Sequence, residues 1–117
     1  MVLVQCLTTM SLDAQIVDSV TGEIDRELST QIDAEQHAEL FEKVRLQPSR
    51  FPLLLRLKDY YADVENTTDE LQPLIAEIER TAGLFEPGSR VYRFTEPFHY
   101  MCVSAFLRRK SVGLYAD

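Results

Sequence analysis

The sequence predicts an α+β domain in which about four helices pack on one face of a small, mainly antiparallel sheet. Three observations predict this class. Runs of β-type apolar residues lie near both ends of the chain, segments between them carry apolar residues at helical spacing, and capping residues precede several of those segments. With 117 residues, the chain has the length of one globular domain, which we expect to span residues 1–117.

The N-terminal part is predicted to be β-structure. Residues 1–9 are almost continuously apolar and read as a strand buried on both faces. Residues 14–28 read as a hairpin, because Gly22 between two β-type segments can adopt the positive φ of a turn. The second arm, residues 25–28, is polar and acidic, so we expect an exposed edge strand or a frayed loop there.

Two helices are predicted next. The first spans residues 34–46, with Asp33 as its N-cap and basic residues near its end. The second spans residues 51–62, with Pro52 in its first turn, where the missing amide proton costs nothing. Its leucines form a wide apolar arc, so we expect it to be the central helix of the core.

The C-terminal half is predicted to hold a third helix, a strand, a fourth helix and a last strand. Thr67 and Glu70 have the spacing of a capping box, which starts a helix over residues 68–82 after a connector. The remaining predicted elements are a short strand at 91–94, a helix at 96–110 capped by Thr95, and a strand at 112–115 that pairs with the first strand.

Composition excludes several classes of protein. A content of 45% hydrophobic and 26% charged residues is typical of a folded domain. The net charge of −7 argues against nucleic-acid binding, which depends on excess Lys and Arg. No apolar run approaches the length of a membrane span, and no basic segment typical of a secretory signal precedes the first apolar residues. We therefore expect a cytoplasmic protein with no membrane contact, whose two cysteines, Cys6 and Cys102, are buried and reduced.

Charged residues are sorted into blocks of one sign. Between residues 59 and 79 every charged side chain is acidic: Asp59, Asp63, Glu65, Asp69, Glu70, Glu77 and Glu79. Just upstream lies a basic stretch without an acid: Lys43, Arg45, Arg50, Arg56 and Lys58. Blocks of one sign create a directional field that favours charged partners. For the cations we rather expect pairing with the chain's own acidic blocks, which would orient one helix against the next.

The end of the second predicted helix carries the strongest candidate site. Asp59 and Asp63 lie one helical turn apart, with Tyr60 and Tyr61 between them and Glu65 just beyond. One interpretation is a hydrolase or metal-dependent enzyme that uses Asp59, Asp63 and Glu65. The other is an exposed polar face that either recognises a partner or is only solvated.

No other residue set has the spacing of a catalytic or metal site. His99 and Cys102 are three residues apart on a predicted helix, but a structural zinc site needs four ligands, which would require Cys6 and His37 to converge there. We expect His37 to be an exposed helix residue. With only four glycines, no phosphate-binding loop can be identified, and we expect no cofactor.

Residues 54–65, LLRLKDYYADVE, followed by residues 68–78, TDELQPLIAEI, resemble small acidic bacterial proteins of the immunity type. The resemblance covers two predicted helices and their connector. It implies a non-enzymatic protein that blocks a toxin by offering an acidic surface to a basic active site. It carries over no catalytic residue.

The sequence therefore predicts a binding module that presents an acidic surface to a basic protein partner. The residues expected to contact this partner are Asp59, Tyr60, Asp63, Glu65, Asp69 and Glu70. A tyrosine would act as the aromatic anchor and the carboxylates as pairing and steering groups. The oligomeric state stays open, and self-association through strand edges or the last helix is a further alternative.

Overall fold

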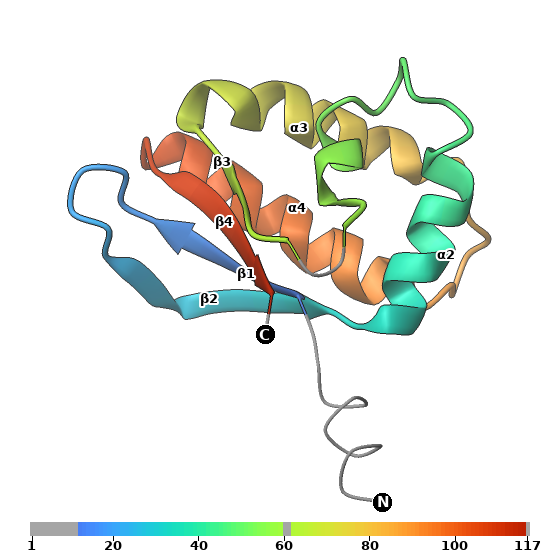
Figure 1. Cartoon of the computed structure of the whole chain (residues 1–117), viewed down its shortest axis with the longest axis horizontal. Helices are drawn as coiled ribbons and strands as arrows, with labels where there is room; N and C mark the ends of the chain where they lie inside the picture. The colour runs from blue at the N-terminus through green and yellow to red at the C-terminus, as the bar shows by residue number, and fades with distance from the viewer. Residues whose placement is uncertain (1–11, 60–61, 117) are drawn as a thin grey trace, which may run out of the picture.

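The structure, a computed structural model, describes residues 12–59 and 62–116. Its sheet has four antiparallel strands in the order β2-β1-β4-β3 (Figure 1). The strands are β1 (Leu12–Val17), β2 (Ile24–Ile32), β3 (Val64–Asn66) and β4 (Ser111–Ala116). The strand predicted at residues 1–9 lies outside the described residues, and β4 pairs instead with β1 and β3.

The predicted N-terminal hairpin is confirmed and consists of β1 and β2. Its turn contains Gly22 at φ +77°, and the Asp18 side chain accepts hydrogen bonds from Val20 N at 2.9 Å and Thr21 N at 3.1 Å. These bonds lower the pKa of Asp18, because they favour its charged form. The second arm is the edge strand β2, and a bulge interrupts its pairing with β1.

The helix predicted from residue 34 is also confirmed as α2 (Ala34–Val44). Asp33 caps it by accepting a hydrogen bond from Gln36 N at 2.7 Å, and the Gln36 side chain accepts one from Asp33 N at 3.0 Å. Two unpaired amides of the helix start are thereby satisfied locally. His37 is half-buried rather than exposed, since its Nε2 lies 2.8 Å from the carbonyl oxygen of Leu57.

The second predicted helix is wrong. Residues 51–62 contain only one short 3₁₀ turn, η1 (Leu54–Leu57), and no α-helix is present in their described part. The buried carboxylate of Glu77 accepts hydrogen bonds from Leu53 N at 3.0 Å and Leu54 N at 2.9 Å. This contact from a distant helix fixes the start of η1, which local apolar spacing could not reveal.

The predicted connector after residue 64 is wrong as well, because Val64–Asn66 forms strand β3 against β4. Asn66 is fully buried, and its side-chain nitrogen and oxygen have no hydrogen-bond partner among the described residues. The next helix is confirmed as α3 (Thr68–Thr81), with the capping box of Thr67 and Glu70 in place. The backbone amide of Thr67 lies 3.0 Å from the Glu70 carboxylate.

The last helix, α4 (Tyr92–Leu107), begins earlier than predicted. The predicted strand at 91–94 is its N-terminal end, and Thr95 lies inside it rather than at its cap. Phe94 and Phe98 stack with ring centroids 4.9 Å apart, and both are almost completely buried. Burial of these rings on one helical face outweighs the β-propensity of Val91, Tyr92 and Phe94.

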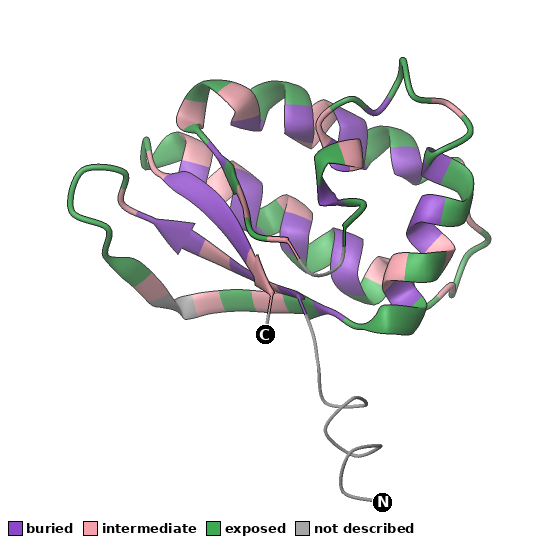
Figure 2. Cartoon of the chain, in the orientation of Figure 1, coloured by how far each residue is buried: buried purple, intermediate pink, exposed green. Residues whose placement is uncertain are grey.

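The described residues thus hold three α-helices and one 3₁₀ turn, not about four helices, although the α+β class is correct. Helices α3 and α4 pack together against one face of the sheet, and α2 packs beside η1 (Figure 1). Alternate strand residues such as Ala14, Ile16 and Leu114 enter one apolar core between these layers (Figure 2). Cys102 lies in this core as a free thiol, as predicted, whereas Cys6 is outside the described residues.

Several cations pair with acids from distant elements, as expected from the sequence. Arg56 contacts Glu70 at 2.6 Å and Arg108 contacts Asp25 at 2.7 Å. Arg90 reaches Glu39 at 3.1 Å and also contacts Glu35. Because the arginine of each pair is at least 40% exposed, each pair contributes only about 0–1 kcal/mol and mainly orients one element against another.

Candidate functional site

The sheet face opposite α3 and α4, called the open face below, collects two of the predicted partner-binding residues. Its outward positions follow from strand alternation and register. Glu65 lies opposite Gly113, which lies opposite Gln15, and Asp13 lies opposite Tyr115. No described helix covers this face, in contrast to the other side of the same strands (Figure 1).

Asp63 joins Glu65 at this edge of the sheet. Its carboxylate accepts a hydrogen bond from Ala116 N at 2.8 Å, which ties residue 63 to the end of β4. Asp63 and Glu65 flank Val64, so strand alternation places both on the side away from the core. The prediction that Asp59 and Asp63 lie one turn apart on a helix is wrong, because η1 ends before Asp59.

Tyr115 is the aromatic side chain of the open face. It folds back over Gly113, since a Cβ atom at residue 113 would collide with the tyrosine ring and hydroxyl. Burial raises the pKa of Tyr115, and the nearby carboxylates of Glu65 and Asp63 raise it further. The Tyr115 hydroxyl therefore lies within the electrostatic influence of both the Glu65 and the Asp63 carboxylates.

The other predicted site residues lie elsewhere. Asp69 is exposed in the first turn of α3, and Asp59 is exposed after η1. Glu70 is tied to its own chain: the amide of Thr67 and then the guanidinium of Arg56 hold its pKa below the ordinary value. Arg56 also donates to the carbonyl oxygen of Glu65 at 3.0 Å. Tyr60 lies outside the described residues.

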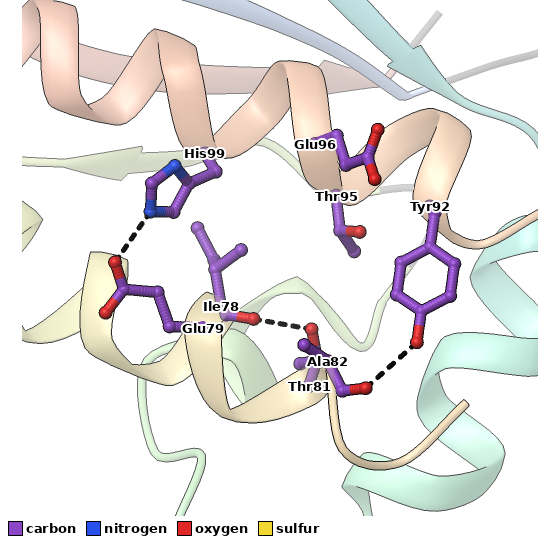
Figure 3. A pocket seen from close by; sticks show the side chains of 8 residues that line it. All are labelled: Ile78, Glu79, Thr81, Ala82, Tyr92, Thr95, Glu96 and His99. Atoms are coloured by element: carbon purple, nitrogen blue, oxygen red, sulfur yellow. Dashed lines mark hydrogen bonds and ion pairs between the residues drawn. The ribbon is translucent and has the colours of Figure 1, made fainter. Parts of the chain in front are cut away.

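A second candidate is a cleft between α3 and α4, shown in Figure 3 and called the α3–α4 cleft below. Its volume is about 290 Å³. The residues that line it come from two adjacent helical faces: Ile78, Glu79, Thr81, Ala82, Tyr92, Thr95, Glu96 and His99. Their spacing of three and four residues along each helix explains why they meet in one place.

Hydrogen bonds fix both ends of the cleft. His99 Nε2 lies 2.9 Å from a Glu79 carboxylate oxygen and joins the two helices at one end. At the other end, the Tyr92 hydroxyl lies 3.0 Å from the carbonyl oxygen of Ala82 (Figure 3). It also lies 2.7 Å from the carbonyl oxygen of Phe85. The tyrosine proton can serve only one of these acceptors at a time.

The described residues offer neither a cluster of metal ligands nor a reactive thiolate. No group of three potential metal ligands occurs among them. Cys102 is fully buried, and loss of solvation raises the pKa of its thiol to about 12, so it is not a thiolate at neutral pH. His99, three residues away, contacts Glu79 in the α3–α4 cleft.

Sequence reasoning missed Asp13 and Tyr115 as companions of Asp63 and Glu65. The signal that could have found Asp13 is the alternation Leu12-Asp13-Ala14-Gln15-Ile16, in which polar residues occupy every second position. Tyr115 could not be assigned in this way, because its neighbours depend on which strands flank β4.

The chain matches no protein-family model, no curated protein and no solved structure. None of the helices in residues 12–59 and 62–116 is long and apolar enough to cross a membrane. The geometry of the two candidate sites therefore carries the functional argument.

Proposed function

We propose that this protein is a cytoplasmic binding module whose open face engages a basic protein partner. The observation that carries the proposal is the gathering of Asp13, Asp63 and Glu65 around Tyr115 on the sheet face that no described helix covers. No outward position in the register of β1, β3 and β4 is Lys or Arg.

Charge complementarity explains why the partner is basic. Carboxylates held near one another repel, and lysine or arginine side chains of a partner relieve that repulsion on contact. The field of the patch also attracts a basic surface before contact and so raises the association rate. Tyr115 supplies a rigid aromatic surface of the kind that often dominates binding energy.

The resemblance to immunity-type proteins suggests one form of this partner, a toxin with a basic active site. Of the two segments that carry the resemblance, residues 68–78 lie in α3, whereas residues 54–65 hold η1 and the start of β3. The basic partner is therefore inferred from the acids of the open face. That this partner is a toxin is inferred from the resemblance alone.

The test captures a partner from the native host on the immobilised protein and then measures its affinity for two variants of equal charge. The first, D13N/D63N/E65Q, neutralises the open face. The matched control, E23Q/E42Q/E86Q, removes three exposed acids, one before β2, one on α2 and one in the loop before α4.

We expect the open-face variant to bind about tenfold or more weakly and the control to bind like the unmodified protein. Affinity should also fall steeply as salt rises, because exposed charges are screened. Equal losses in both variants would mean that only net charge matters. An affinity that is flat with salt would contradict the electrostatic mechanism.

A further inference from the structure

The outer edge of β2 is the longer of the two edges of the sheet that residues 12–59 and 62–116 form. β2 lies at one side of this sheet and pairs there with β1 alone, so within the described chain its other side has no strand beside it (Figure 1). The backbone amides and carbonyl groups that point away from β1 therefore lack a strand partner. An edge of this kind is a template for one more strand.

The opposite edge, β3, is short and closed by side chains. It has three residues, and Arg56 donates to the carbonyl oxygen of Glu65 at 3.0 Å. Just before β3, the Asp63 carboxylate accepts a hydrogen bond from Ala116 N at 2.8 Å. No described side chain hydrogen-bonds to the backbone of residues 28–32 of β2. The edge of β2 is therefore the one that can take another strand.

Residues 28–32, with the sequence LSTQI, carry none of the features that protect strand edges. They include no charged residue and no proline. The bulge lies outside this stretch, because the register with β1 is continuous from Ser29 to Ile32. On the other side the strand ends at Asp33, the N-cap of α2. The unprotected part of the edge is therefore five residues long.

These five residues are complementary to themselves. In antiparallel pairing with a second copy about a two-fold axis at Thr30, Leu28 lies opposite Ile32 of the other copy. Ser29 then lies opposite Gln31. Leu28 and Ile32 both pack against the core, whereas Ser29 and Gln31 lie on the open face, so each pair joins side chains of one face. No like charges meet, and a second copy supplies this complement at every contact, which an unrelated peptide does not.

Helix α4 offers further contact area beside β2. Pro97, Ser104 and Arg108 are seven and four residues apart, so they lie on one flank of the helix. Arg108 contacts Asp25 of β2 at 2.7 Å, which places this flank on the β2 side. Tyr100, which is 65% exposed, borders the flank at spacings of three and four residues. Because paired strands lie only about 4.8 Å apart, pairing of two β2 strands would bring these flanks of the two copies toward each other.

We propose that the protein forms a two-fold symmetric dimer in which residues 28–32 of β2 pair antiparallel with the same residues of a second copy. The two sheets become one continuous sheet. Because the axis is perpendicular to this sheet, the helices of both copies lie on one side and both open faces on the other. The dimer thus offers two acidic patches to a single partner surface. Only this last consequence rests on the proposed function.

Sedimentation equilibrium of the whole protein over a range of concentrations tests the dimer. We expect the mass to rise from that of one chain toward that of two. The mass of one chain at about 1 mM would overturn the proposal. Growth beyond two chains would do the same, because two-fold pairing closes on itself. Protection of the amides of residues 28–32 from hydrogen exchange in a monomer would show that the chain covers its own edge, and would also overturn it.

Two double variants test the register. S29K/Q31K places lysine opposite lysine on both sides of the axis and should weaken association about tenfold or more relative to S29K/Q31E, which places lysine opposite glutamate. S29K/Q31K also reduces the net charge of each chain from −7 to −5 (two added lysines), so net charge alone would act in the opposite direction.

Both substituted positions are exposed, and circular dichroism checks that each variant is folded. Equal association of the two variants would overturn the pairing about Thr30. That outcome would leave the binding role of the open face standing, because one copy is sufficient for it.

Discussion

The two faces of the sheet use alternate residues of the same strands for opposite purposes. On β1, Ala14 and Ile16 are fully buried under the helices, whereas their neighbours Asp13 and Gln15 are only half-buried on the open face. The covered face excludes water from apolar side chains and so supplies most of the stability. The open face gathers like charges, which favours a partner more than it favours the fold. Stability and recognition should therefore be separable by mutation.

The largest expected effect comes from the covered face. Phe98 is fully buried in the core and stacks on Phe94. Phe98→Ala should lower the free energy of unfolding by about 3–5 kcal/mol, because it removes apolar contact and leaves a cavity. Denaturant titration measures this loss. Gln15→Ala on the open face is the control and should change stability by no more than about 0.5 kcal/mol; a comparable loss there would remove the distinction between the faces.

The second prediction contrasts a buried acid with the acids of the open face. Glu77 is 2% exposed and accepts hydrogen bonds from Leu53 N and Leu54 N. Glu77→Ala should cost about 2–3 kcal/mol, since two amides at the start of η1 lose a charged acceptor. Chemical denaturation again measures it. If Glu77→Ala proves as harmless as Glu65→Gln, these contacts do not hold η1 in place.

The third prediction concerns the polar exception on the covered face. Asn66 is fully buried, and within residues 12–59 and 62–116 its side-chain amide finds no hydrogen-bond partner. Asn66→Val should raise the free energy of unfolding by about 1 kcal/mol, because an unmet desolvation cost disappears and a β-branched residue enters a strand. Thermal unfolding reports the change. A lower melting temperature would show that a bound water or another group satisfies this amide.

The fourth prediction tests pH dependence through His37, which the fold brings against Leu57. Partial burial lowers the pKa of His37, because the charged form loses solvation. The unfolded chain then binds the proton more readily, so this contribution to stability is complete above the ordinary histidine pKa of about 6.5 and falls as the pH drops below it. His37→Gln keeps an N–H donor but cannot titrate. The free energies of unfolding of the original protein and the His37→Gln variant should therefore approach each other as the pH falls from 7.5 to 5.5. A constant difference between the two proteins over this pH range would contradict the role given to His37.

The smallest effect is expected on the open face itself. Glu65→Gln should leave stability within about 0.5 kcal/mol of the original, because it removes a repelling surface charge. It should also lower the pKa of Tyr115 toward the ordinary value, since Glu65 is the largest electrostatic cause of the rise after burial. Ultraviolet difference titration against Tyr115→Phe isolates this tyrosine. An unchanged pKa would place Glu65 away from the ring.

Elements with a local chemical signal could be predicted well. The capping boxes at Asp33 and Thr67 and the glycine of the hairpin turn act within a few residues, so sequence alone locates α2, α3 and the β1–β2 turn. Residues 51–62 and 91–94 were predicted wrongly, because their apolar side chains fit either a helix or a strand. For these segments, contacts with Glu77 and the stacking of Phe94 on Phe98 decide the outcome.

The candidate sites divide in the same way. An excess of acid between residues 59 and 79 is a property of the sequence, and Asp63 and Glu65 could be named from it. Their meeting with Asp13 and Tyr115 required the register of β1, β3 and β4, which joins residues about fifty or more positions apart. The α3–α4 cleft likewise depends on how two helices pack. The sequence by itself determined the charge, which follows from composition, and the local caps, which act over one turn of chain. The tertiary structure decided which charges share a surface, because that depends on pairing between distant segments.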